Sequence, residues 1–221
     1  MASTGIAFFD LDHTLLDGDS DSSFIDFLGE RGVLAGELVA SKDPIGDAYM
    51  QGRPWEADYR VFLRQVYEGR SVSELRLLAE EHVTARVREL FYPGARALVE
   101  KQRDERQAIA LLTTTNQLVS SPIAAALGID VVLSTQLEVV GERYTGELVG
   151  AFCTGPGKAR ALRDHCRTLG VDPAECAMFG DGRSDMDALA AVGEPVAVHP
   201  TDALERHARE RGWRVLDLSL G

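Results

Sequence analysis

The stretch Phe8-Phe9-Asp10-Leu11-Asp12-His13-Thr14-Leu15-Leu16 places two aspartates, one residue apart, directly after an apolar run that begins at Ile6. A continuous apolar run of this kind is typical of a strand that is buried on both faces of a sheet. The two acids therefore stand where the strand would end. We expect the rest of the chain to bring partners to Asp10 and Asp12 or to cover them.

Strand and helix patterns alternate along most of the remaining chain. Apolar runs predict further strands at Ala108–Leu112, Val131–Leu133, Cys176–Phe179, Val196–Val198 and Trp213–Leu216. Helical patterns lie between or after them, at Ala95–Arg106, Pro122–Leu127, Lys158–Leu169, Asp185–Ala191 and Thr201–Arg211. Pro122 suits the first position of the second of these helices. Ser120 and Ser121, which precede it, could then cap that helix. This alternation predicts an α/β fold whose parallel sheet carries helices on both faces.

Two segments interrupt the alternation. Residues 17–90 contain helical patterns, such as Ser20–Leu28 and the spacing of Trp55, Tyr59 and Phe62, but no convincing strand. The sequence therefore predicts a helical insert directly after the first strand. Residues 137–149 flank a Gly-Glu-Arg turn with short β-type runs, which predicts a β-hairpin near the cleft.

The composition excludes several classes of protein. The 221 residues carry a net charge of −12, which argues against a nucleic-acid or anionic-membrane surface. No apolar run approaches the roughly 18 residues of a membrane span, and the first residues do not resemble a signal peptide. The three cysteines and five histidines show no metal-binding spacing. These features favour a cytoplasmic protein with reduced thiols.

Polar residues cluster at the predicted strand ends. The first strand ends at Asp10, the second at Thr113, and the fourth runs into Asp181 and Asp185. Lys158 opens a helix at the same edge. Ligands bind beyond the carboxyl ends of the strands in open parallel sheets, so this edge is the predicted site.

These residue types suit phosphoryl chemistry. Several carboxylates in one cleft cannot all stay ionised without a cation, and oxygen ligands alone favour Mg²⁺. Lys158 and the Thr113 hydroxyl could then bind the other oxygens of a phosphoryl group. Alone, each of these residues also has an ordinary structural explanation, such as a solvated lysine or a helix cap. Their order at successive strand ends favours catalysis.

The motifs Asp10-x-Asp12-x-Thr14, Thr113, Lys158 and Gly180-Asp181-Gly182-x-x-Asp185 resemble those of haloacid-dehalogenase-superfamily phosphatases. The insert resembles the cap of subfamily IB, the branch that contains phosphoserine phosphatase. The fuller string Thr113-Thr114-Thr115-Asn116 is similar to bacterial histidinol-phosphatase-like members. The resemblance implies a Rossmann-like catalytic core at residues 1–16 and 91–221, with a helical C1-type cap at 17–90.

The resemblance also implies a role for each motif residue and Mg²⁺ as the cofactor. Asp10 would be the nucleophile and a metal ligand, Asp12 the acid/base with its carbonyl on the metal, and Asp181 a metal ligand. Thr113 and Lys158 would bind phosphate. Asp185 would support the metal or Lys158, and Thr14 would support Asp12 by hydrogen bonding. Family members that cleave carbon–halogen bonds lack the second aspartate, so Asp12 favours phosphate-ester hydrolysis.

The substrate is less closely defined. Asp19 lies where phosphoserine phosphatases carry an acid that meets the substrate amine, but it could equally be a loop or cap residue. Thr114 and Thr115 replace the glycines usual in phosphoserine phosphatases, and Arg53 is more simply a surface residue than a carboxylate ligand. Both observations argue against phosphoserine as the substrate.

We therefore predict a Mg²⁺-dependent phosphomonoester hydrolase that acts on a small metabolite through an aspartyl-phosphate. The leading substrate is histidinol phosphate, and phosphoserine is the alternative. A phosphotransferase and a non-catalytic phosphate-binding module also remain open. The expected partner is a small phosphate ester, with no nucleic acid and no membrane, and the chain is expected to be a monomer or homodimer.

Overall fold

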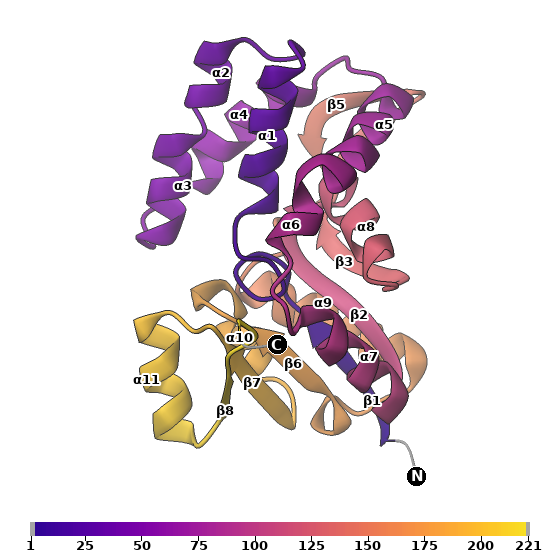
Figure 1. The fold of residues 1–221 in the computed structure, drawn as a ribbon, viewed down its shortest axis with the longest axis vertical. Coiled ribbons are helices and arrows are strands. Elements are labelled where there is room, and N and C mark those ends of the chain that lie inside the picture. Colours follow the sequence, from indigo (N-terminus) through magenta and orange to yellow (C-terminus); the bar gives the residue numbers. More distant parts are fainter. Residues whose placement is uncertain (1–2, 220–221) are drawn as a thin grey trace.

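A parallel sheet forms the lower part of the molecule in the computed structural model, which describes residues 3–219 (Figure 1). Its six strands run in the order β3-β2-β1-β6-β7-β8. The strands are β1 (Ser3–Phe9), β2 (Arg106–Asn116), β3 (Val131–Thr135), β6 (Ala177–Gly180), β7 (Glu194–Val198) and β8 (Arg214–Leu216). The predicted parallel α/β sheet is confirmed, and β1 lies near its centre.

Both faces of β1 are buried, as its apolar run predicts. Phe9 and Ala7 pack into one core, where the Phe9 ring stacks on Phe179 at 4.9 Å. Ile6 and Phe8 pack into the other core. The first core includes α7 (Ala95–Glu105) and α8 (Gln117–Ala126), and the second includes α9 (Pro156–Leu169), α10 (Met186–Leu189) and α11 (Asp202–Arg211). This packing fixes the end of β1, and with it Asp10.

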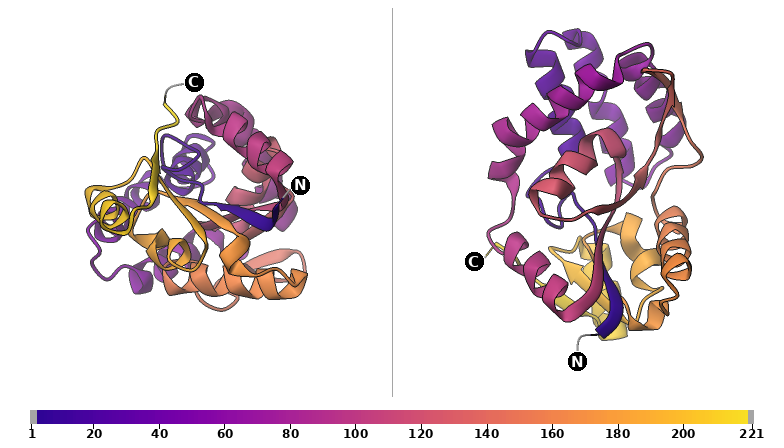
Figure 2. Two further views of the ribbon diagram at one scale, coloured as in Figure 1. Left: turned by 90° about the horizontal axis from the view of Figure 1, so that it is seen from below. Right: turned by 90° about the vertical axis from the view of Figure 1, so that its right-hand side faces the viewer.

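Helices occupy the other end of the molecule, toward which the carboxyl end of β2 points (Figures 1 and 2). They are α1 (Ser20–Glu30), α2 (Gly36–Ala40), α3 (Asp43–Met50), α4 (Glu56–Tyr67), α5 (Val72–His82) and α6 (Arg88–Leu90), with a π-helical turn at Val83–Val87. The expected helical character of this region is confirmed, and its separation as a domain at residues 17–90 stays a prediction. None of the described helices is long and apolar enough to cross a membrane.

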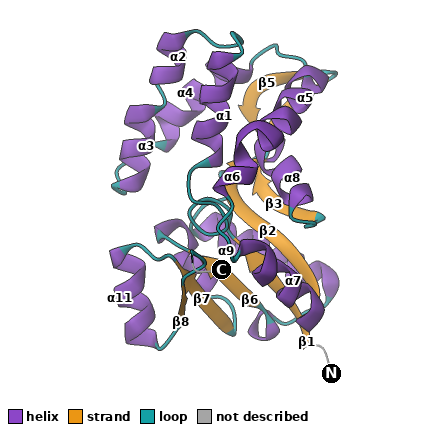
Figure 3. Cartoon of the chain, viewed as in Figure 1, coloured by secondary structure: helices purple, strands orange, loops and turns teal. Residues whose placement is uncertain are grey.

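The predicted hairpin is confirmed as β4 (Leu137–Val140) and β5 (Arg143–Leu148) (Figure 3). It packs against the helical region. The Tyr144 N–H donates to the Arg70 carbonyl at 3.0 Å, and the Tyr144 carbonyl accepts from Gly69 N–H at 2.9 Å. Gly146 has φ +83°, and a Cβ there would lie 2.8 Å from the Arg64 Cα. A glycine is therefore needed where β5 crosses α4.

The predicted start of the helix at Pro122 is wrong. Helix α8 begins at Gln117, and Pro122 lies inside it. Asn116 is the cap, because its Oδ1 accepts from the backbone N–H groups of Leu118 and Val119. The Asn116 cap satisfies two backbone N–H groups that would otherwise lack a partner. This gain outweighs the preference of proline for the first position of a helix.

His82 is a buried base in the helical region. Its Nε2 lies 2.9 Å from Ser23 Oγ, and its ring packs between Phe24 and Phe27. Burial, followed by the charge of Arg86, lowers the pKa of His82 to about 4. The folded state therefore favours the neutral ring, so protonation during acidification opposes folding.

We expect His82 to lower the free energy of unfolding as the pH falls. The loss begins near pH 6.5, the pKa of an unfolded histidine, and continues to about 4, the pKa of His82 in the fold. Between pH 7 and pH 4.5 this group should remove about 2 kcal/mol from the free energy of unfolding. Urea denaturation of wild type and His82→Gln at both pH values measures the difference. If the free energy of unfolding falls by the same amount in both proteins between pH 7 and pH 4.5, His82 is not the group responsible.

Candidate active site

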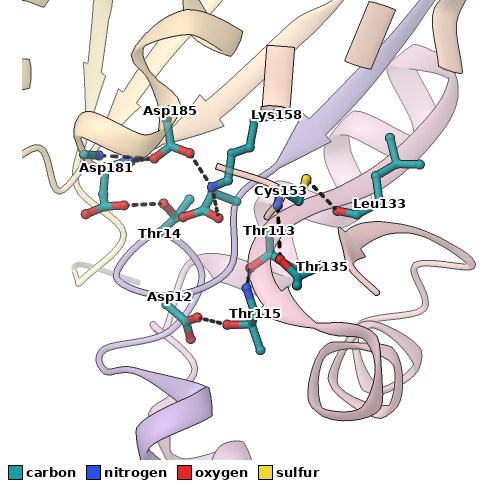
Figure 4. Close-up of polar contacts among 12 residues, drawn as sticks. Asp12, Thr14, Thr113, Thr115, Leu133, Thr135, Cys153, Lys158, Asp181 and Asp185 are labelled. Carbon is teal, nitrogen blue, oxygen red and sulfur yellow. Dashed lines mark hydrogen bonds and ion pairs between the residues drawn. The ribbon is translucent and has the colours of Figure 1, made fainter. Parts of the chain in front are cut away.

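Lys158 joins two of the predicted acids at the carboxyl edge of the sheet. Its Nζ donates to Asp10 Oδ1 and to Asp185 Oδ1, both at 2.6 Å (Figure 4). The lysine is 1% exposed and lies in the first turn of α9. Asp10 directly follows β1, and its N–H donates to the Phe179 carbonyl of β6 at 2.8 Å. The expected meeting of these three residues is thus present.

The turn after β6 is shaped around the Asp185 carboxylate. Its Oδ2 accepts from the backbone N–H groups of Asp181 and Gly182, each at 3.2 Å. A Cβ at Gly180 would lie 2.7 Å from the Asp185 side chain, so only glycine fits there. Asp185 is completely buried, and its partners are Lys158 and this turn. It holds both in place.

Three carboxylates form an oxygen cluster that could hold a metal ion. One oxygen each from Asp10, Asp181 and Asp185 lies within 4.8 Å of the others. Burial, and then the charge of Asp185, raise the pKa of Asp10 to about 7 in spite of Lys158. Burial and the charges of Asp185 and Asp10 raise the pKa of Asp181 well above its usual value. A hard cation with oxygen ligands would relieve this repulsion.

The Asp12 side chain makes different contacts from those of Asp10. Its Oδ1 accepts from Ser20 N–H at 2.7 Å, and its Oδ2 accepts from the Thr115 hydroxyl at 2.6 Å (Figure 4). Burial, and then the charge of Asp19, raise the pKa of Asp12 to about 7. A carboxyl group with this pKa can both give and take a proton near neutral pH.

Thr14 and Thr113 both make hydrogen bonds within the site region, while the phosphate contact expected of Thr113 stays a prediction. The expected hydrogen bond from Thr14 to Asp12 is not made; the Thr14 hydroxyl instead donates to Asp181 Oδ1 at 3.5 Å. Thr113 is buried, and its Oγ1 accepts from Thr115 N–H at 3.2 Å. Strand β2 also continues past Thr113 to Asn116, so Thr113 lies within the strand and not at its end.

Asp19 caps helix α1. Its Oδ1 accepts from Ser22 N–H at 2.7 Å, and the residue is exposed. This is the contact expected of an ordinary cap residue. Arg53, the weaker candidate for a substrate carboxylate, is also exposed, and its Nε donates to Gln51 Oε1 at 3.0 Å. Residues 52–58 line an open hollow of about 430 Å³, and none of the motif residues lines it.

Sequence reasoning assigned no contact in this region to Thr115, Asn116, Asp21 or Tyr49. Thr115 binds Asp12, while the Asn116 amide donates to Asp21 Oδ1 at 3.0 Å. Burial raises the pKa of Tyr49 in α3, and the nearby charge of Lys158 partly offsets this effect. The string Thr113-Thr114-Thr115-Asn116 could have indicated Thr115, because alternate residues of a strand share a face and Thr115 therefore lies on the same face as Thr113.

Comparisons with known proteins identify the family. The model for haloacid dehalogenase-like hydrolases matches residues 7–190. A Mycobacterium tuberculosis protein named phosphoserine phosphatase is 34% identical over 98% of this chain and 72% of its own. A Neisseria meningitidis protein named histidinol-phosphatase is 29% identical over 96% of this chain and 98% of its own. A solved structure of a Bordetella pertussis protein of unknown function superposes with a TM-score of 0.89 and 30% identity, covering 98% of this chain and 99% of that one. This chain therefore belongs to the haloacid dehalogenase-like hydrolase family.

Proposed function

We propose that the protein is a Mg²⁺-dependent phosphomonoester hydrolase that works through a phosphorylated Asp10. The observation that carries the proposal is the oxygen cluster of Asp10, Asp181 and Asp185 with Lys158 at its side. Family membership and relatives named as phosphatases support the same reaction. The presence of Asp12 favours an oxygen leaving group, because such a group needs a proton.

The donor set fits Mg²⁺. All side-chain ligands are carboxylate oxygens, and burial together with the charge of Asp185 raises the pKa values of Asp10 and Asp181. Asp10, Asp181 and the backbone carbonyl of Asp12 would hold the ion, with Asp185 in support. When bound, the ion would offset the negative charge of the phosphoryl group.

In the proposed reaction, an Asp10 oxygen attacks phosphorus, and the bond from phosphorus to the ester oxygen breaks. Asp12 gives its proton to the leaving oxygen. Asp12 then takes a proton from water, whose oxygen attacks phosphorus and releases phosphate from Asp10. Lys158 and Thr113 bind the remaining phosphoryl oxygens. The hydrogen bonds from Ser20 N–H and the Thr115 hydroxyl hold the Asp12 carboxyl in position for both transfers.

A small metabolite fits the proposal best, because the helices at the carboxyl edge would limit access to the site. Histidinol phosphate leads and phosphoserine is the alternative, each matching the name of a relative. Both carry an amine. We propose that Asp19, the residue that caps α1, attracts that positive charge. A monomer or homodimer in the cytoplasm remains the expectation for the protein's state.

Mg²⁺ removal tests the function directly. The protein should hydrolyse p-nitrophenyl phosphate with Mg²⁺, and excess EDTA should lower the rate by at least about 100-fold because the carboxylate cluster loses its cation. Re-addition of Mg²⁺ should restore the rate. Full activity in EDTA would contradict the metal-dependent mechanism.

Two alternatives predict different products. A phosphotransferase would pass the phosphoryl group to an added alcohol, which appears as a new phosphate ester beside inorganic phosphate. A non-catalytic phosphate-binding module would bind phosphate without hydrolysing any ester.

Thr115 offers a test of the role of Asp12. We expect Thr115→Val to lower kcat/KM for an alkyl phosphate about tenfold, the loss expected for one hydrogen bond to a charged group. The loss for p-nitrophenyl phosphate should be less than about threefold, because p-nitrophenolate leaves without a proton.

Thr114→Val is the matched control, since the Thr114 hydroxyl is buried without a hydrogen-bond partner among residues 3–219. It should not change the ratio between the two substrates. Equal losses on both substrates in Thr115→Val would show that Thr115 does not act through the proton donor.

A further inference from the structure

The chain passes twice between the sheet and helices α1–α6, and the two connections lie side by side. The first follows β1, and the second leads into α7. Asp17 N–H donates to the Leu90 carbonyl at 2.7 Å, and Tyr92 N–H donates to the Leu15 carbonyl at 3.1 Å. An isolated antiparallel bridge lies between these two bonds. We call residues 15–17 and 90–92 the paired connection. A movement of the helices relative to the sheet would bend it.

Residues 217–219 follow β8 and hold the end of the second connection. The Leu218 carbonyl accepts from Gly94 N–H at 2.9 Å, and the Leu218 N–H donates to His199 Nε2 at 3.0 Å. The Leu218 side chain is buried, and a Cβ at Gly94 would lie 3.3 Å from the Leu218 carbonyl oxygen. Leu218 therefore ties the second connection to the loop that follows β7.

The His199 ring contacts the paired connection directly. It stacks on the Tyr92 ring, with the ring centroids 3.9 Å apart and 21° between the ring planes. The Tyr92 hydroxyl donates to Asp17 Oδ1 at 3.3 Å, so this contact reaches both connections. The Nδ1 of His199 lies 3.5 Å from Asp217 Oδ1. One ring thus joins the paired connection to the residues that follow β8.

The loop after β7 also reaches the proposed site. Its Thr201 N–H donates to the Asp181 carbonyl at 2.9 Å. The Asp181 side chain accepts from the Thr14 hydroxyl at 3.5 Å, and Thr14 directly precedes the first half of the paired connection (Figure 4). The paired connection, the loop after β7 and the predicted metal ligand Asp181 are therefore joined by direct contacts.

We propose that residues 217–219 and the His199 ring form a strap that restrains the paired connection and keeps helices α1–α6 closed over the site. The strap acts through the backbone bonds of Leu218 and the ring stack on Tyr92. Loosening it should let the helices move away from the sheet, and the open molecules should bind substrate poorly. The restraint does not depend on the proposed function; only its effect on the reaction rate does.

Spin labels on the two parts of the molecule test the restraint. Glu37 on α2 and Glu210 on α11 are exposed and lie in the upper and lower parts of Figure 1. The three native cysteines are buried, so labels on Glu37→Cys and Glu210→Cys report the separation of the helices from the sheet. With the strap intact, we expect one distance population and less than about a tenth of a second one. Tyr92→Leu removes the ring stack and should raise the second population to about half, since an aromatic pair is worth up to about tenfold in an equilibrium.

Two further proteins separate the strap from the other contacts of Tyr92. Tyr92→Phe is the matched control, because it loses the hydrogen bond to Asp17 but keeps the ring stack, and it should show the distances of wild type. A chain that ends at Leu216 lacks the bonds of Leu218 and should show the second population, as Tyr92→Leu does.

The kinetic effect should appear in KM. With about half of the molecules open, KM of Tyr92→Leu for p-nitrophenyl phosphate should rise about twofold, because only the closed half binds substrate well. Its kcat should match that of wild type, since bound substrate holds the helices closed.

The outcomes separate the strap from the proposed function. Unchanged distances in both Tyr92→Leu and the chain that ends at Leu216 overturn the inference, whatever the activity. Equal second populations in Tyr92→Phe and Tyr92→Leu overturn the part assigned to the ring stack. If wild type hydrolyses no phosphate ester but the distances change as expected, the proposed function fails and the strap is supported.

Discussion

Asp10→Asn will lower kcat/KM for any phosphomonoester substrate by at least about 10⁴-fold, because an amide cannot replace the carboxylate as nucleophile. The substitution keeps the size and shape of the side chain. Lys158 still has Asp185 as a partner at 2.6 Å, so the buried lysine is not left without a counter-charge. The loss should therefore be chemical and not structural. Steady-state hydrolysis in saturating Mg²⁺ measures it.

Folding measurements provide the control for Asp10→Asn. Its circular dichroism spectrum should match that of wild type, and its free energy of unfolding should change by less than about 2 kcal/mol. A variant that is folded but retains more than about one tenth of wild-type activity would exclude Asp10 as the nucleophile.

Lys158→Met should have the largest effect on stability. The lysine is 1% exposed and lies between the Asp10 and Asp185 carboxylates. Burial opposes its charge, but these two acids raise the pKa of Lys158 well above its usual value, so it is a cation in the fold. Without it, two buried carboxylates lack their cation. The free energy of unfolding at pH 8 without Mg²⁺ should fall by about 3–5 kcal/mol.

The deficit of Lys158→Met should depend on pH in a defined direction. The folded-state pKa of Asp10 is already raised to about 7 by burial, and loss of the lysine charge should raise it further above its unfolded value. Stability is then present at low pH and lost as the pH rises, so the difference from wild type should be smaller at pH 5 than at pH 8. Urea denaturation at both pH values measures this.

Lys101→Met is the matched control for Lys158→Met. Lys101 is 56% exposed, and its Nζ lies 3.9 Å from Glu105. Its loss should change stability by less than about 0.5 kcal/mol at either pH. A pH-independent deficit in Lys158→Met would indicate lost packing and not uncompensated charge.

Most of the fold could be predicted because the apolar runs are unambiguous. The run from Ile6 to Phe9 is buried on both faces, and the predicted strands all form. Helix starts were less predictable where two capping signals competed, as at Asn116 and Pro122. The hairpin was predicted, but its packing against α4 depends on Gly146 and Arg64, which are far apart in sequence.

The site could be predicted where a strand end fixes a residue. Asp10, Lys158 and Asp185 meet as expected because three elements converge at one edge of the sheet. Contacts made across the cleft could not be predicted, because they depend on how the helices sit above the sheet. The Asn116–Asp21 hydrogen bond, which joins β2 to α1, is of this kind. His13, with φ +59° in the turn after Asp12, shows backbone strain that the sequence does not signal.

The central claim is that phosphate passes through a covalent bond to Asp10. Acid quenching during turnover, followed by borohydride reduction and peptide mass spectrometry, converts an acyl-phosphate aspartate to homoserine and locates it. We predict homoserine at position 10 in wild type only when substrate is present, and none at Asp12. Absence of homoserine at position 10 under turnover, or its appearance at another acid, would contradict the account.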